Sequence, residues 1–199
     1  MPASETSPLG RSNRHERQAG SMLVEFALVI LVFLAFLFAV IDMARLMFVT
    51  NTLQEATRRA ASFSSTSNPG SAAGYDAIRY KAIFRTSPGG LMLMPELTDK
   101  SVRIDYLAVV RDSSGAYSTQ EIPGGLISSD PAQNRHNCVV DPYAANCIRF
   151  VRVRICDPQN TATCEPMKFK PLLNFFSFEI PLPTATTISK SQSFGYTPN

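Results

Sequence analysis

The sequence predicts an α+β protein in which a long N-terminal transmembrane and stalk helix packs on a small antiparallel β-rich domain. Three observations lead to this fold class. An apolar segment near the N-terminus is long enough to cross a bilayer, an amphipathic pattern continues from it without a break, and short alternating segments with four cysteines fill the rest of the 199 residues. This length allows one domain and an additional segment, and it excludes a large multidomain enzyme.

The chain begins with a polar leader that gives way to the apolar segment. Residues 1–20 are rich in Pro and Ser and lack the apolar side chains that a core needs, so we expect a solvated basic leader. Every residue from 22 to 41 is apolar except Glu25. About 20 helical residues cross a hydrocarbon core about 30 Å thick. We therefore predict a transmembrane helix over residues 21–41.

Two other interpretations of the apolar segment fit less well. One is a buried core helix. The phenylalanines fall on several faces, which suits lipid on all sides better than a half-buried surface helix. A cleaved secretory signal usually has an apolar stretch of about 7 to 15 residues and a small-x-small site. This run is longer, and Asp42-Met-Ala-Arg45 follows it. More arginines lie close before the span than close after it, which favours a cytoplasmic N-terminus.

We expect one continuous helix that extends beyond the membrane over residues 42–67, rising about 1.5 Å per residue. Pro69-Gly70 would end it. Asp42 is placed to pair with Arg45, and Glu55 with Arg58 or Arg59, each pair worth a few tenths of a kcal/mol. The predicted buried stripe repeats at three and four residues: Met43, Leu46, Met47, Thr50, Leu53, Ala56 or Thr57, and Ala60.

The remaining residues, 68–199, contain patterns for one short helix and several strands. A helix is expected over 72–86, with Tyr75, Ile78 and Ala82 on one face. Strands are expected over 102–111 and 116–122 as a hairpin with a turn at 113–115, and over 148–156 with Arg152 and Arg154 facing out. Weaker strand patterns cover 167–170 and 185–190, on either side of a Pro-punctuated stretch at 171–183.

The four cysteines favour two structural disulfides. Cys138, Cys147, Cys156 and Cys164 form no C-x-x-C pair, and their spacing is wrong for the common zinc sites, although a zinc ion could recruit His136. Four cysteines allow three pairings. We favour Cys138 with Cys147 and Cys156 with Cys164, because the second bond would close a turn directly after the clearest strand. Disulfides fit an oxidising compartment for this domain.

No motif argues for an enzyme, a metal site or a cofactor. His15 and His136 are the only histidines, and the chain contains no G-x-S-x-G, G-x-x-x-x-G-K-[ST] or G-x-G-x-x-G motif. The formal net charge is +3 and is spread along the chain. No segment has the concentrated positive charge that nucleic-acid binding requires.

The most informative pattern is a glycine at the membrane boundary followed by a carboxylate inside the apolar run. Gly20-Ser-Met-Leu-Val-Glu25-Phe has this form. A carboxylate within a span costs about 2 to 3 kcal/mol at the centre and usually signals function. Together with the basic leader, this set resembles the prepilin processing site. The wider stretch from Gly20 to Ala61 resembles the TadE family of tight-adherence (Tad) pilus-assembly pseudopilins, and residues 167–191 resemble it more loosely.

Two features of the span depart from the family pattern. The family often has a proline within the span, which this chain lacks, and often a glutamate where Asp42 stands. Neither departure touches the processing site.

The resemblance implies a pilin-like, non-catalytic minor subunit of Tad pilus assembly. A prepilin peptidase would cleave between Gly20 and Ser21, and the new α-amine of Ser21 would neutralise Glu25 of a neighbouring pilin or pseudopilin. The protein would be a single-pass inner-membrane protein with a periplasmic domain. Two alternatives remain at this point: a pseudopilin of another type IV pilus or type II secretion machine, and a membrane-tethered periplasmic binding module.

Overall fold

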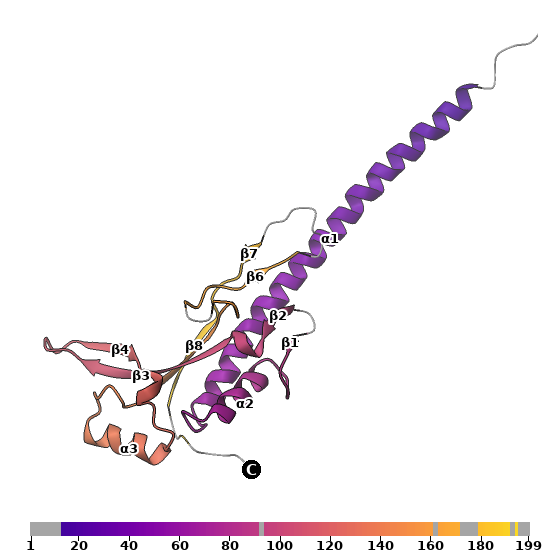
Figure 1. Cartoon of the computed structure of the whole chain (residues 1–199). Coiled ribbons are helices and arrows are strands. Elements are labelled where there is room, and N and C mark those ends of the chain that lie inside the picture. The colour runs from indigo at the N-terminus through magenta and orange to yellow at the C-terminus, as the bar shows by residue number, and fades with distance from the viewer. Residues whose placement is uncertain (1–12, 92–93, 161–162, 172–178, 192–193, 195–199) are drawn as a thin grey trace, which may run out of the picture. The chain divides into compact units, whose positions relative to one another are not determined.

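The computed structural model describes residues 13–91, 94–160, 163–171, 179–191 and 194, with side chains from residue 20 onward. Its elements are those of an α+β chain, in which one long helix precedes short helices and antiparallel strands (Figure 1). The chain divides into two compact units, residues 1–45 and 46–199. The predicted fold class is confirmed. Residues 172–178, within the Pro-punctuated stretch, lie outside the described residues.

Helix α1 (Asn13–Ser64) is continuous through the predicted span and stalk. It begins within the predicted solvated leader, because residues 13–19 consist mainly of residues that tolerate a helix. It ends close to the predicted position. Ser65 and Ser67 donate their N–H groups to the carbonyls of Ala61 and Phe63, and Gly70 then takes a left-handed φ of 82°.

The part of α1 in the second unit buries one face in the core of that unit. Val49, Leu53, Ala56 and Ala60 are each no more than 2% exposed, at the spacing of four, three and four that one helix face requires. The predicted stripe was wrong at Met43 and Met47, which are 57% and 59% exposed. Val49 takes the buried position instead, because it lies four residues before Leu53 and on the same side of the helix.

A four-stranded antiparallel sheet packs against this half of α1, with strand order β4-β3-β5-β8 (Figure 1). The Thr187 hydroxyl of β8 donates to the Thr57 hydroxyl of α1 at 2.9 Å. Val151 and Val153 of β5 are completely buried on the face towards the core. The strands are β3 (Val102–Arg111), β4 (Tyr117–Glu121), β5 (Phe150–Ile155) and β8 (Thr186–Lys190).

The hairpin of β3 and β4 has the predicted position and turn. The Asp112 carboxylate accepts the N–H groups of Ser114 and Ala116, each at 2.9 Å. Gly115 has a φ of 85°, which a residue without a Cβ adopts easily. An aspartate that holds the turn and a glycine that permits it therefore fix the pairing of the two strands.

Helix α2 (Ala72–Ala82) covers another part of the core. The Ser71 hydroxyl accepts the N–H of Gly74 at its N-terminus, and Ile78 and Ala82 are buried as predicted. The helix ends four residues before the predicted position 86. Phe84 has a φ of 59°, which an α-helix cannot accommodate.

Several short elements were not predicted. They are β1 (Gly90–Leu91) paired with β2 (Met94–Thr98), the 3-10 turns η1 (Asp99–Ser101) and η2 (Gly124–Leu126), helix α3 (Pro131–Val140), and β7 (Ile180–Pro181). Strand β7 pairs with β6 (Lys168–Phe169), which lies inside the predicted weak strand at 167–170.

Two disulfides close short loops beside these elements. Cys138 of α3 is bonded to Cys147, and Cys156 at the end of β5 is bonded to Cys164. These are the two pairs that the sequence favoured. All four cysteines are thereby bonded, so none offers a thiolate to a zinc ion. His136 is exposed on α3.

Candidate functional site

The first candidate site is the start of the apolar part of α1. Gly20, Ser21 and Glu25 lie on consecutive turns of the helix and all three are exposed. A Cβ placed on Gly20 would meet no atom within 4 Å, so the surrounding structure does not explain why this residue is glycine. Ser21 and Glu25 are four residues apart and therefore share one face of the helix.

The side chains around Glu25 are exposed and apolar. Met22, Leu23, Val24 and Phe26 are between 60% and 75% exposed. Helix residues 20–64 have a mean hydropathy of 3.0 in their most apolar window, and none of that window is buried. By length and composition this helix can cross a membrane. An apolar helix exposed on all sides fits a membrane anchor, and Glu25 is then a carboxylate within lipid-facing side chains.

The ion pairs predicted on α1 lie beyond the apolar run. Arg45 contacts Asp42 at 3.4 Å, and Glu55 pairs with Arg59 at 2.8 Å. The Arg59 guanidinium also lies over the ring of Phe84, 4.2 Å from its centroid. The sequence left the choice between Arg58 and Arg59 open, and Arg59 is the residue that pairs with Glu55 while its guanidinium lies over Phe84.

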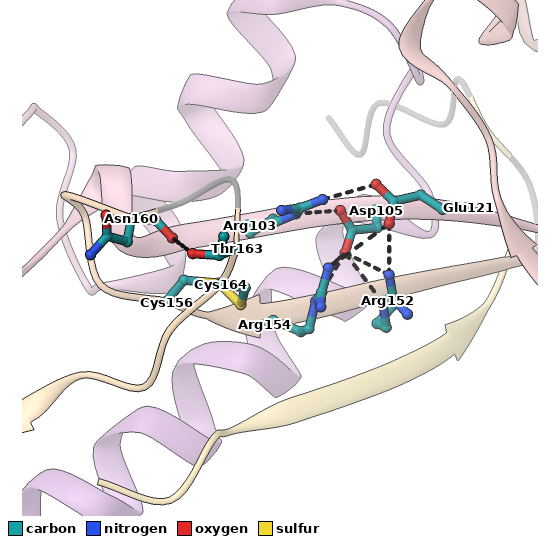
Figure 2. The surroundings of a disulfide bond; sticks show 9 residues. All are labelled: Arg103, Asp105, Glu121, Arg152, Arg154, Cys156, Asn160, Thr163 and Cys164. Carbon is teal, nitrogen blue, oxygen red and sulfur yellow. Dashed lines mark hydrogen bonds and ion pairs between the residues drawn. A yellow bond between two sulfur atoms is a disulfide. The ribbon is translucent and has the colours of Figure 1, made fainter. Parts of the chain in front are cut away.

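The second candidate site is a charge cluster on the face of the sheet that points away from α1. In the register of β3 and β5, Asp105 lies opposite Arg152 and Arg103 lies opposite Arg154. All four side chains project from the same face, because alternate residues of a strand share a face. Figure 2 shows three guanidiniums converging on the Asp105 carboxylate, with Glu121 of β4 beside them.

The Asp105 carboxylate is the centre of this cluster and is almost completely buried. Its side chain is 3% exposed, against 24–26% for the three arginines. One oxygen accepts from Arg103 at 2.8 Å, and the other accepts from Arg152 at 3.1 Å and from Arg154 at 2.6 Å. Glu121 bridges Arg103 and Arg152 at 3.0 and 2.9 Å. Each carboxylate therefore has charged donors on both oxygens.

The electrostatics of the cluster favour the ionised carboxylate. Burial by itself would raise the pKa of the Asp105 carboxyl. The hydrogen bonds and positive charge of Arg103 and Arg154 outweigh burial, so the pKa lies below its ordinary value. Hydrogen bonds from the guanidinium to Asp105 in turn raise the pKa of Arg103. The cluster joins three strands through fixed charges.

The sequence interpretation missed this cluster. It placed Arg152 and Arg154 on the outer face, which is the face they occupy, but assigned them no partner. The available signal was a second alternating pair, Arg103-x-Asp105, in another predicted strand. The strand register that brings the pairs together was not predictable from spacing alone.

The described part of the chain contains no cluster of side chains suited to a metal ion. Among those residues, no group of three or more His, Cys, Asp and Glu side chains is placed to hold a metal ion. His15 belongs to the part of α1 whose side chains are not described.

Comparison with known proteins gives one match. No curated protein and no solved structure matches this chain. A family model does match, and it begins at Gly20, the glycine at the start of the apolar run. Residues 20–62 match the family model described as TadE-like protein, which confirms the resemblance expected from the sequence over the long helix of this chain.

Proposed function

We propose that this protein is a minor pseudopilin of Tad (type IVc) pilus assembly and acts as a structural subunit without catalytic activity. Residues 1–20 are a cytoplasmic leader, residues 21–41 cross the inner membrane once, residues 42–67 continue the helix into the periplasm, and residues 68–199 complete the periplasmic domain. The observation that carries the proposal is the TadE-like match over residues 20–62, which starts at the proposed processing glycine.

A prepilin peptidase cleaves the chain between Gly20 and Ser21. Glycine suits this position because it has no side chain and lets the backbone extend into a peptidase active site. The exposure of Gly20, with open space around its α-carbon, is compatible with such access. Cleavage removes the basic leader and leaves an α-amine on Ser21, which ordinarily titrates near pH 8 and is therefore mostly protonated at pH 7.

The new ammonium pairs with Glu25 of a neighbouring subunit. An unpaired carboxylate among lipid-facing side chains is costly, and an opposite charge from the next helix offsets that cost. The same contact fixes how far one helix is displaced along the other. Within one chain Ser21 and Glu25 are also one turn apart, so an internal pair competes with the contact between subunits.

The charge contact is tested by replacing Glu25 in cells that assemble the pilus. Glu25→Gln keeps the shape of the side chain and removes its charge, whereas Glu25→Asp keeps the charge. Incorporation of the subunit into sheared pili, or its co-purification with other pilins, should fall strongly for Glu25→Gln and much less for Glu25→Asp. Cleavage should be unchanged in both variants. Equal incorporation of Glu25→Gln and the unmodified protein would contradict the charge role.

A further inference from the structure

The exposed side of α1 stays apolar beyond the predicted end of the span. Met43, Met47 and Phe48 follow Ile41 in the chain and are 57%, 59% and 47% exposed. Apolar side chains scattered singly over a surface are common, but these three are neighbours on one stretch of helix. A contiguous exposed apolar patch marks a contact with a partner or with a membrane.

The same side of the helix becomes polar directly after Phe48. The next exposed positions along α1 are Asn51, Gln54, Arg58 and Arg59. Met47 and Gln54 lie two turns from each other on one face of the helix. That face carries a methionine at one level and an amide at the other. The surroundings of the helix therefore change along its axis and not only around it.

The apolar side is too broad for one neighbouring helix. Each residue turns the helix by about 100°, so Met43 and Phe48 are about 140° apart around its axis, and Met47 lies between them. The seam that one neighbouring helix covers is narrower. Lipid surrounds a helix and covers a broad arc as readily as a narrow one. A lipid layer therefore fits this surface better than a second helix does.

The polar side chains near this patch already have partners on α1. Arg45 pairs with Asp42 at 3.4 Å, and their side chains are only 25% and 19% exposed. Thr50 and Thr52 each donate their hydroxyl to a backbone carbonyl of α1, at 2.9 and 2.8 Å. A helix that enters an apolar layer must satisfy its own polar groups. This stretch of α1 meets that requirement.

The distance from the span fits the headgroup layer of a bilayer. Hydrocarbon accounts for about 30 Å of a total thickness of about 40 to 45 Å, so each headgroup layer adds about 5 to 8 Å. The rise of the helix from Ile41 to Phe48 is about 10 Å. Helical side chains lean towards the N-terminus, here towards the membrane, so the Phe48 ring lies nearer the hydrocarbon than its own Cα does. Phenylalanine is among the residues that interfacial helices bury at this boundary.

We propose that Met47 and Phe48 bind the phospholipid headgroup layer on the side of residues 46–199 and hold that unit directly on the bilayer surface. Val49 directly follows Phe48, is 2% exposed, and is the first buried residue of α1 from Gly20 onward. No free stalk therefore separates the lipid from the folded unit. The proposal rests on the membrane crossing in the proposed function, and it does not depend on cleavage at Gly20 or on pilus assembly.

The depth of Phe48 can be measured with tryptophan, which the chain lacks. Three exposed phenylalanines of α1 give a matched series: Phe33→Trp in the apolar run, Phe48→Trp, and Phe63→Trp in the polar part. Each full-length, disulfide-bonded variant is reconstituted in vesicles of phosphatidylcholine and phosphatidylglycerol. Lipids brominated in the middle of the acyl chain, lipids with a nitroxide on the headgroup, and acrylamide in the water quench tryptophan at three depths. Thermal unfolding establishes that each variant is folded.

Headgroup nitroxide should lower the fluorescence of Phe48→Trp at least about twofold, and more than brominated chains or acrylamide do, because the ring lies in the headgroup layer. Phe33→Trp should respond most to brominated chains, and Phe63→Trp only to acrylamide. The proposal is overturned if Phe48→Trp behaves like either of them. It is also overturned if all three quenchers leave Phe48→Trp unchanged, because another protein surface then covers the ring. Phe33→Trp without bromine quenching would instead contradict the membrane crossing itself.

Discussion

Asp105 lies directly opposite Arg152 in the pairing of β3 with β5, and their side chains meet at 3.1 Å on the outer face of the sheet. Arg103 and Arg154 approach the same carboxylate from the next cross-strand pair. The buried Asp105 carboxylate thus binds three guanidiniums. The cluster holds the centre of the sheet on the face that α1 does not cover.

Replacing Asp105 should destabilise the domain. In Asp105→Asn, three partly buried arginines lose their shared negative partner, and removing one partner of a buried ion pair typically costs about 3 to 5 kcal/mol. The arginine side chains are about a quarter exposed, and solvent screens their charges, so we expect the free energy of unfolding to fall by about 2 to 3 kcal/mol. Glu121→Gln, at a side chain that is 43% exposed, should cost less than about 1 kcal/mol. Urea unfolding of the oxidised protein measures both, and equal losses would contradict the central role of Asp105.

The same carboxylate should make stability depend on acidic pH. Its folded-state pKa is below the ordinary value of 3.8, so its contribution is fully present above that value and is lost as pH falls through the folded-state pKa. The free energy of unfolding should therefore fall more steeply below about pH 4 in the unmodified protein than in Asp105→Asn. Unfolding curves from pH 6 downward measure the difference between the two proteins. Parallel pH profiles of the two proteins would show that the arginines do not lower the pKa of the Asp105 carboxyl.

The buried face of α1 should be sensitive to truncation and its exposed face should not. Leu53 is 2% exposed in the core, so Leu53→Ala should lower the free energy of unfolding by about 2 to 5 kcal/mol. Met47, on the same stalk, is 59% exposed, and Met47→Ala should change it by less than about 0.5 kcal/mol. A loss for Met47→Ala as large as that for Leu53→Ala would show that Met47 is buried, as the sequence first predicted.

The disulfides should protect all four cysteines from alkylation and should stabilise the domain. Without reductant, iodoacetamide should label none of them in the denatured protein. Cys156→Ala with Cys164→Ala opens a loop between residues eight apart, and the chain-entropy estimate for such a loop is about 2.5 kcal/mol. Thermal unfolding of the double variant and of the unmodified protein measures the loss in free energy of unfolding. Full labelling of the unreduced protein would place the domain in a reducing compartment.

Local patterns predicted the elements that have strong periodicity. Strand β3 has the predicted bounds, and Val151, Val153 and Ile155 of β5 face the core as expected. The alternation is visible in the sequence because one face of each strand is buried. The end of α1 was also predictable from the sequence, because Pro69-Gly70 follows it.

Elements with a weak pattern were missed. Helix α3 begins with Asp130 as its N-cap and Pro131 in its first turn, which is a recognisable start. Its ten residues bury little apart from Asn134, whose side chain accepts the N–H of Ile148 at 3.0 Å. An amide that binds a distant backbone group leaves no apolar periodicity in the sequence.

The candidate sites differ in how far the sequence defines them. Gly20 and Glu25 form a contiguous motif, so their pattern was visible without a structure. The cluster at Asp105 depends on which strands pair and in which register. Pairing register is a long-range property, and the spacing within each strand does not contain it.

The N-terminal residue of the mature protein tests the central claim most directly. The protein is extracted from membranes of cells with an active prepilin peptidase, and its N-terminus is read by Edman degradation or by mass spectrometry. The account predicts Ser21 as the first residue, and it predicts that Gly20→Val retains residues 1–20 while Ser21→Ala is still cleaved. An intact leader in the unmodified protein, in cells where other prepilins are processed, would contradict it.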